Sequence, residues 1–205
     1  MTKTEKVLEK LHKEARFDFL KIKPAAMISG GRLRPEHFKK AYLPISEEQG
    51  RFVHDLIIQK DLKNIVEFGT SFGISTMYMA DAVRQISGKM VTTELLQSKA
   101  ERALSNLKEA ELNDYVQILI GDAMQTLKGF NEPVDLLFLD GWKDLYLPLF
   151  QMLEPLFHSG TVIYSDNMDM SGTEQLAEYL WHHKANYQTE FVQGGKATLT
   201  IARAA

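Results

Sequence analysis

The stretch that decides the fold is "NIVEFGTSFGIS", residues 64–75, in which a short apolar run leads into two glycines and a helical pattern. Residues 64–70 predict a β-strand, and the run from Ser75 to Arg84 predicts the helix that follows it. Gly69 and Gly73 would lie in the connecting turn, where missing side chains let a ligand approach the backbone and the helix N-terminus. The spacing is not G-x-G-x-x-G, and a tight turn between strand and helix would explain both glycines as well.

The same alternation of strand and helix continues along the chain and predicts an α/β protein. Helices of about 10 to 15 residues separate further strands at 89–95, 115–122, 134–140 and 160–167. The last helix of this series is expected from Tyr146 to Phe157. At the end of the chain, "YQTEFV" and "ATLTIAR" flank "QGGK" and predict an antiparallel hairpin. The pattern therefore predicts a doubly wound, mostly parallel sheet of seven strands with a C-terminal antiparallel hairpin. This arrangement suits a methyltransferase better than a dehydrogenase.

Composition limits the classes of function. The chain of 205 residues is long enough for one well-packed domain, and its net charge of −3 gives no general reason to expect a nucleic-acid partner. It has no cysteine, which excludes disulfides, thiolate nucleophiles and zinc sites built on cysteine. The charged N-terminus resembles no signal peptide, and no stretch is apolar enough to span a membrane. We therefore expect a cytoplasmic protein whose partner is a small molecule.

The first part of the chain, residues 1–44, predicts a helical segment, and residues 45–205 predict the main domain. The apolar residues of the N-terminal segment recur at helical spacing, namely Val7, Leu8, Leu11, Ala15 and Phe19. This apolar face could pack on the domain or on a second subunit, so a homodimer is one interpretation. The stretch "MISGGRLRP" (27–35) is predicted to be flexible and could form a lid.

Two acids at predicted strand ends suggest how a nucleoside could be held. Glu94 ends the second strand, 25 residues after Gly69, where a carboxylate can accept hydrogen bonds from both ribose hydroxyls. Asp122 ends the third strand, and its carboxylate with the next backbone N–H could hold the edge of an adenine. Each acid also has a simpler interpretation: Glu94 as a solvated carboxylate, and Asp122 as the N-cap of the next helix.

Three oxygen ligands follow the fourth and fifth strands. Asp140 ends the fourth, and Asp166 with Asn167 ends the fifth, so all three should meet at one edge of the sheet. Carboxylates and an amide without histidine or cysteine describe a site for a hard cation such as Mg²⁺, although "SDN" is also an ordinary turn sequence. Lys143 would share that edge, where a divalent cation would disfavour its ammonium form and make it a general base. It could instead simply pair with Asp144.

These motifs together resemble a known family. "FLDGWKDLYLP" (138–148) and "GTVIYSDN" (160–167) closely resemble the metal-dependent catechol O-methyltransferase family, which includes the caffeoyl-CoA type and many small bacterial enzymes. "PISEEQGRFVHDLI" (44–57), "VEFGTSFGIS", Glu94 and "GDAMQTL" (121–127) follow in that family's order and spacing. The resemblance covers residues 44–167 and implies the Rossmann-like fold of class I methyltransferases.

The resemblance also implies roles for individual residues. S-adenosylmethionine would be bound by the turn residues Glu67, Gly69, Thr70, Ser71 and Ser75, by Glu94 at the ribose, by Asp122, Ala123 and Trp142 at the adenine, by Leu43 and Ile45 at the methionine end, and beside Asp140. Mg²⁺ would be held by Asp140, Asp166 and Asn167, with Lys143 as the base. The implied reaction is Mg²⁺-dependent methyl transfer from S-adenosylmethionine to a hydroxyl of a small molecule with neighbouring hydroxyls.

Other functions stay open at this stage. The family's catechol branch carries histidine where this chain has Gly141, and Glu190 is only a candidate for a contact to a second acceptor hydroxyl. A methyltransferase of the same fold could act on a sugar or a natural-product scaffold, with or without a metal. A nicotinamide-dependent oxidoreductase would share the logic of Glu94 but would need the missing G-x-G-x-x-G. A non-catalytic module could use its basic N-terminal segment to bind a partner.

Overall fold

The computed structural model describes residues 1–17 and 35–203, and it shows one seven-stranded sheet. The strands are β1 (Asn64–Phe68), β2 (Lys89–Glu94), β3 (Val116–Ile120), β4 (Val134–Leu139), β5 (Phe157–Ser165), β6 (Tyr187–Val192) and β7 (Ala197–Ala202). Their order is β3-β2-β1-β4-β5-β7-β6, in which β1 to β5 run parallel and β7 is antiparallel to both of its neighbours. The predicted α/β architecture with a C-terminal hairpin is confirmed.

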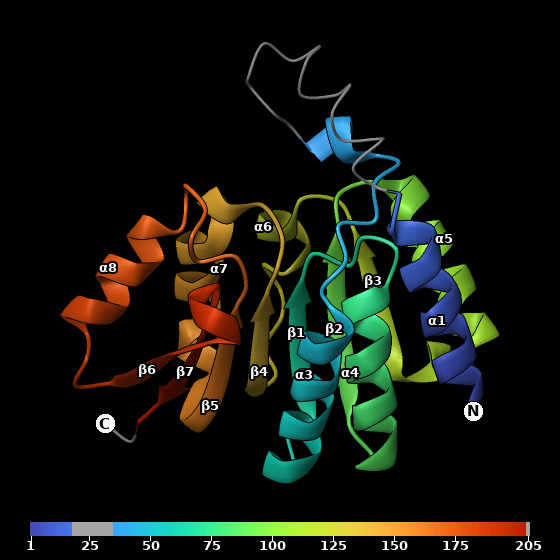
Figure 1. Ribbon diagram of the computed structural model, residues 1–205. Helices are drawn as coiled ribbons and strands as arrows, with labels where there is room; N and C mark the ends of the chain where they lie inside the picture. The colour runs from blue at the N-terminus through green and yellow to red at the C-terminus, as the bar shows by residue number, and fades with distance from the viewer. Residues whose placement is uncertain (18–34, 204–205) are drawn as a thin grey trace.

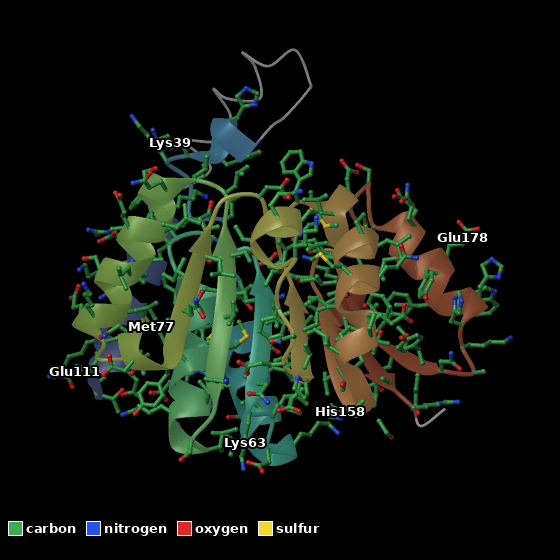
Figure 2. The ribbon with its side chains drawn as sticks, turned by 180° about the vertical axis from the view of Figure 1, so that it is seen from behind. Lys39, Lys63, Met77, Glu111, His158 and Glu178 are labelled. Carbon is green, nitrogen blue, oxygen red and sulfur yellow. The ribbon has the colours of Figure 1, made fainter. Side chains whose placement is uncertain are left out.

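Helices cover both faces of this sheet. They are α1 (Lys3–Ala15), η1 (Pro35–Phe38), α3 (Glu47–Lys60), α4 (Ile74–Gln85), α5 (Gln97–Glu109), η2 (Asn113–Tyr115), α6 (Ala123–Thr126), η3 (Lys143–Leu145), α7 (Tyr146–Leu153), η4 (Glu154–Leu156), α8 (Glu174–His182) and η5 (Gln193–Gly195). Figure 1 shows α3 and α4 in front of the strands, and Figure 2, seen from behind, brings α7 and α8 to the front. The buried apolar side chains accordingly form two clusters, one on each face.

One helix is shorter than the sequence predicts. The helix expected to reach Phe157 ends at Leu153, because Pro155 cannot supply an N–H for a continuing helix. A single 3₁₀ turn intervenes, and β5 then begins at Phe157, earlier than the expected start at residue 160. The difference lies at the amino end of β5, far along the strand from Asp166.

The N-terminal helix packs within the chain. Thr2 caps α1 with a complete capping box, and Val7, Leu8, Leu11 and Ala15 are buried in the core cluster shared with α4. Ion pairs from Lys3 to Glu111 and from Lys10 to Glu109 tie its outer face to the end of α5. Of the two interpretations of this apolar face, packing on the domain is the one observed, and a homodimer stays a prediction. Phe19 and most of the expected lid at 27–35 lie outside the described residues.

Two further features concern the surroundings of the sheet. Within residues 1–17 and 35–203, no helix is both long and apolar enough to cross a membrane.

Lys63 and His158 lie at one end of the molecule and Lys39 at the opposite end, next to the carboxyl ends of the parallel strands (Figure 2). The candidate site lies at this second end.

Candidate active site

The predicted residues converge because the carboxyl ends of five parallel strands are level with one another. The backbone N–H of Asp140 donates to the carbonyl of Phe68 at 3.0 Å, and that of Asp166 donates to the carbonyl of Leu139 at 2.9 Å. The chain runs outward from β1 through β2 to β3, then returns to β4 on the other side of β1. This change of direction is the usual place for a ligand in an open α/β sheet.

Gly69 lets the first turn lie directly against the end of β4. Its φ of 108° is one that side-chain-bearing residues rarely adopt, and a Cβ there would lie 2.9 Å from the carbonyl carbon and oxygen of Asp140. The N–H groups of Gly69 and Thr70 both donate to the carbonyl of Thr93, at 3.2 and 3.0 Å. The turn is therefore fixed between β2 and β4 and leads into the N-terminus of α4.

Glu67 is fully buried beneath this turn. Its carboxylate accepts hydrogen bonds from the hydroxyls of Ser75 at 2.5 Å, Thr76 at 2.6 Å and Thr92 at 2.6 Å. Burial raises the pKa of Glu67 to about 7, against the lowering effect of these three hydroxyls. Two predicted cofactor residues, Glu67 and Ser75, thus bind each other and join β1 to α4, and their contact with a cofactor stays a prediction.

Glu94 holds the outside of the same turn. Its two carboxylate oxygens accept the backbone N–H groups of Ser71 at 2.8 Å and Leu96 at 2.9 Å, and burial raises the pKa of Glu94. The buried Lys99, in the first turn of α5, donates to the hydroxyl of Ser71 at 3.1 Å. The interpretation of Glu94 as a solvated carboxylate is wrong, since it is largely buried. The sequence did not predict that Lys99 contacts this turn, although a lysine five residues after Glu94 could have suggested a charge near that carboxylate.

The segment before α3 reaches the glycine turn through Tyr42. The hydroxyl of Ser71 donates to the carbonyl of Tyr42 at 2.7 Å, and the Tyr42 ring stacks on Phe72 with centroids 4.3 Å apart. Leu43, which follows, has a φ of 48° and is exposed, whereas Ile45 is buried. Leu43 directly follows the residue that contacts the turn, and contact of Leu43 and Ile45 with a cofactor stays a prediction.

The residues expected at the adenine have mixed surroundings. Asp122 is exposed and caps α6, its carboxylate accepting the N–H of Met124 at 2.9 Å. Ala123 is buried, and the half-buried Trp142 packs on the apolar cluster under the carboxyl end of β4. The helix cap that the sequence offered as one interpretation of Asp122 is therefore present, and it leaves the second carboxylate oxygen of Asp122 available to a ligand.

The acids that directly follow β4 and β5, Asp140 and Asp166, form a poorly solvated pair. Burial raises the pKa of Asp140 to about 7, with Lys143 opposing the rise and Asp166 adding to it. Burial also raises the pKa of Asp166. The ammonium of Lys143 lies 3.4 Å from Asp140 Oδ1, so its ion pair is with Asp140. A bound cation would offset the mutual repulsion and the desolvation cost of two ionised carboxylates held in this way.

A cation here would also need the amide of Asn167. In the part of the chain that the structure describes, no three His, Cys, Asp or Glu side chains are grouped as a metal site. Asn167 follows Asp166 directly, with a φ of 52° that turns the chain away from β5. Two carboxylates and one amide, with other positions left to water or a ligand, are a donor set that fits Mg²⁺.

Two residues near these acids were not predicted. Lys143 donates to the hydroxyl of the buried Tyr146 at 2.7 Å, and that hydroxyl lies 2.7 Å from the carbonyl of Leu139 and 3.0 Å from that of Asp166. Burial raises the pKa of Tyr146 well above its usual value. Gln49, from the first turn of α3, donates to Asp166 Oδ1 at 3.0 Å. The "SEEQ" capping box was a visible signal for a helix start, but nothing in the sequence linked Gln49 to a residue 117 positions away.

The two positions that bear on the acceptor differ in what surrounds them. A Cβ on Gly141 would lie 2.4 Å from the ring of Phe68, so Phe68 occupies the space that a side chain at 141 would need. Glu190 is exposed on the edge strand β6, and its contact with an acceptor stays a prediction.

Comparisons with known proteins place the chain in a family. A profile described as a methyltransferase domain matches residues 66–168, which run from β1 to just after Asn167. Catechol O-methyltransferase of Niastella koreensis is 35% identical over 134 residues, which is 63% of this chain and 60% of that protein. The chain thus spans about three fifths of the length of the curated relatives that it matches.

Two solved structures are similar over more of the chain. Cofactor-bound Rv0187 from MTB has a TM-score of 0.68 at 25% identity and covers 78% of this chain and 82% of its own. The O-methyltransferase TomG from Streptomyces achromogenes, in complex with SAM, has a TM-score of 0.66 at 25% identity and covers 79% and 82%. The resemblance that the motifs indicated is confirmed. Since the matched profile covers half of its length, this chain belongs to the methyltransferase domain family.

Proposed function

We propose that this protein is an O-methyltransferase that uses S-adenosylmethionine and Mg²⁺ to methylate a hydroxyl of a small molecule with neighbouring hydroxyls. The observation that carries the proposal is the grouping of Asp140, Asp166 and Lys143 at the sheet edge that also holds the glycine turn. The relatives named as catechol O-methyltransferases and the SAM complex of TomG support it.

The cofactor would lie along the glycine turn between β1 and α4. Gly69 leaves the backbone open to close approach, and Glu94 presents lone pairs that Ser71 and Leu96 do not fill. These are suited to the two hydroxyls of a ribose. Leu43 and Ile45 would then meet the methionine end through their backbone, and Asp122, Ala123 and Trp142 would meet the adenine.

Asp140, Asp166 and Asn167 would hold the metal ion, and their chemistry fits it. When bound, Mg²⁺ supplies positive charge that acidifies a hydroxyl and holds two neighbouring oxygens in a fixed position. The protein contributes two carboxylates that are already fixed by the ends of β4 and β5, so little reorganisation is needed. Fixing the reacting groups in this way can supply about 7 to 11 kcal/mol of the barrier reduction.

Lys143 would act as the general base. Its amine takes the proton of the acceptor hydroxyl, and the oxygen then forms a bond to the methyl carbon of S-adenosylmethionine. The bond between that carbon and sulfur breaks, its electron pair stays on sulfur, and S-adenosylhomocysteine leaves. Lys143 is in place because it begins η3 three residues after Asp140, with its amine 3.4 Å from Asp140 Oδ1.

A second candidate is a methyltransferase of the same fold that acts on a sugar or a natural-product scaffold. Gly141, packed against Phe68, favours it, because the catechol branch carries a histidine at this position. TomG, whose structure is similar, is described as involved in tomaymycin synthesis.

The test is an acceptor panel incubated with S-adenosylmethionine, with Mg²⁺ or with excess chelator, and followed by S-adenosylhomocysteine release. Catechols, their singly hydroxylated analogues, sugars and polycyclic scaffolds separate the two candidates. We expect turnover of the vicinal hydroxyl compounds with Mg²⁺ and its loss in chelator. Full activity in chelator would remove the metal from the mechanism.

Variants assign the roles within that assay. Asp140→Asn and Asp166→Asn should abolish turnover while calorimetry shows that S-adenosylmethionine still binds. Lys143→Ala should lower kcat by roughly 10² to 10⁴. An unchanged kcat in Lys143→Ala would show that the lysine is not the base.

A further inference from the structure

We infer that Tyr146 is the positioning residue of the base: its buried hydroxyl fixes the direction from which Lys143 takes a proton. This inference rests on the proposed function, since it concerns the same lysine. Tyr146 is fully buried at the start of α7, one turn after Lys143. Its hydroxyl lies 2.7 Å from the amine.

The hydroxyl can only accept from Lys143. A tyrosine hydroxyl has one hydrogen to donate. Here two carbonyl oxygens surround it, that of Leu139 at 2.7 Å and that of Asp166 at 3.0 Å. Carbonyl oxygens cannot donate, so the hydrogen of Tyr146 points to them. The phenol oxygen therefore presents a lone pair to Lys143, and the amine of Lys143 donates an N–H to it.

The directions around the amine are then nearly settled. One N–H points to Tyr146 at 2.7 Å and another to Asp140 Oδ1 at 3.4 Å. In the described ranges these are the acceptors that lie within hydrogen-bonding distance of the amine. The nitrogen is tetrahedral, so its bond to Cε and these two hydrogen bonds take three of its four directions. The fourth direction is the one from which the amine would take a proton as a base.

The same hydroxyl connects the strands that carry the acids. The carbonyl of Leu139 ends β4 just before Asp140, and the carbonyl of Asp166 follows β5. Through these bonds, Tyr146 fixes the amine of Lys143 relative to the ends of β4 and β5, beside which the acceptor would be held. A purely structural role would use these two carbonyl bonds alone, whereas a positioning role also needs the bond to Lys143.

A double-mutant cycle separates the two roles. Tyr146→Phe should lower kcat at saturating Mg²⁺ by about 10-fold or more, with the KM of each substrate and the calorimetric Kd of Mg²⁺ within about 2-fold of wild type. In a Lys143→Ala background the same substitution should have no further effect on kcat, because residues acting through one step are not additive. The matched control is Tyr187→Phe, which removes another buried tyrosine hydroxyl, bonded to Glu154 at 2.6 Å, and should leave kcat unchanged.

Several outcomes would overturn the inference. A kcat for Tyr146→Phe within 2-fold of wild type would do so, as would an equal effect in the presence and absence of Lys143. If Tyr146→Phe does not fold, a crystal structure of the wild-type protein with S-adenosylhomocysteine, Mg²⁺ and acceptor decides it: the amine must stay hydrogen-bonded to Tyr146. If the wild-type protein itself shows no turnover with any acceptor in the panel, that result would instead count against the proposed function.

Discussion

Replacing Glu67 by glutamine tests the electrostatics of the turn that would bind the cofactor. Glu67 is fully buried, and its pKa is raised from 4.5 to about 7, mainly by burial. The folded protein therefore binds this proton more tightly than the unfolded chain does. Its stability contribution is fully present below pH 4.5 and is lost as the pH rises through about 7.

The size of the effect follows from the two pKa values. One pH unit corresponds to about 1.4 kcal/mol, so ionising Glu67 should cost the folded protein about 3 kcal/mol between pH 4.5 and pH 7. Glutamine keeps the shape of the side chain but cannot ionise. The free energy of unfolding of Glu67→Gln, relative to wild type, should therefore increase by about 2 to 3 kcal/mol as the pH is raised from about 5 to about 8.

Urea unfolding at several pH values measures this difference directly. The protein is kept free of cofactor and metal, so that no ligand contributes to its stability. Subtracting the wild-type curve removes most of the parallel contribution of Asp140, whose pKa is also about 7. Glu190→Gln makes the same chemical change at an exposed position and serves as the matched control for the substitution itself. If the difference for Glu67→Gln does not change with pH, Glu67 does not ionise within this range and burial does not raise its pKa.

Three further predictions concern other parts of the molecule. Gly141→Ala places a Cβ 2.4 Å from the Phe68 ring and should lower the free energy of unfolding by about 1 to 3 kcal/mol; adding Phe68→Leu should restore part of it, and a stable single variant would refute the clash. Gln49→Ala frees Asp166 Oδ1 and should weaken Mg²⁺ binding, measured by calorimetry, by about tenfold; an unchanged Kd would show that Asp166 needs no such support. The pKa of His158 is raised by the Ser159 carbonyl and then by Asp135, so its contribution is present at low pH and lost above its folded pKa; His158→Ala should lower Tm more at pH 5 than at pH 8, and equal losses would exclude the effect.

The order of elements and the edge that carries the site could be predicted from the sequence. An acid stands at the end of β2 and directly after β4 and β5, and a parallel sheet brings all such ends to the same edge. Knowing that Glu94, Asp140 and Asp166 follow strands was therefore enough to place them together. The register of β1 against β2 and β4 then brings these ends level.

The partners of those residues could not be predicted, because they depend on how helices pack across the sheet. Gln49 reaches Asp166 only once α3 is docked against the end of β5. Tyr146 stands in the motif "FLDGWKDLYLP", yet its position suggests an ordinary core tyrosine. The role of its hydroxyl depends on the carbonyls of Leu139 and Asp166, which belong to different strands. Side-chain hydrogen bonds of this kind leave no periodic pattern in a sequence.

The buried acids at this edge are best understood as a cost that the fold carries for ligand binding. After burial, Asp166 and Glu67 both raise the pKa of Asp140, and Glu94 raises that of Glu67. A core built for stability alone would place apolar residues of similar volume here, since an uncompensated buried charge is destabilising. The acids are nevertheless fixed by hydroxyls, by backbone N–H groups and by Lys143, which hold them in place without neutralising all of them. Under the proposed function, carboxylates fixed in this way would need little reorganisation when a cation and a cofactor bind, and this preorganisation would matter more for catalysis than any single residue.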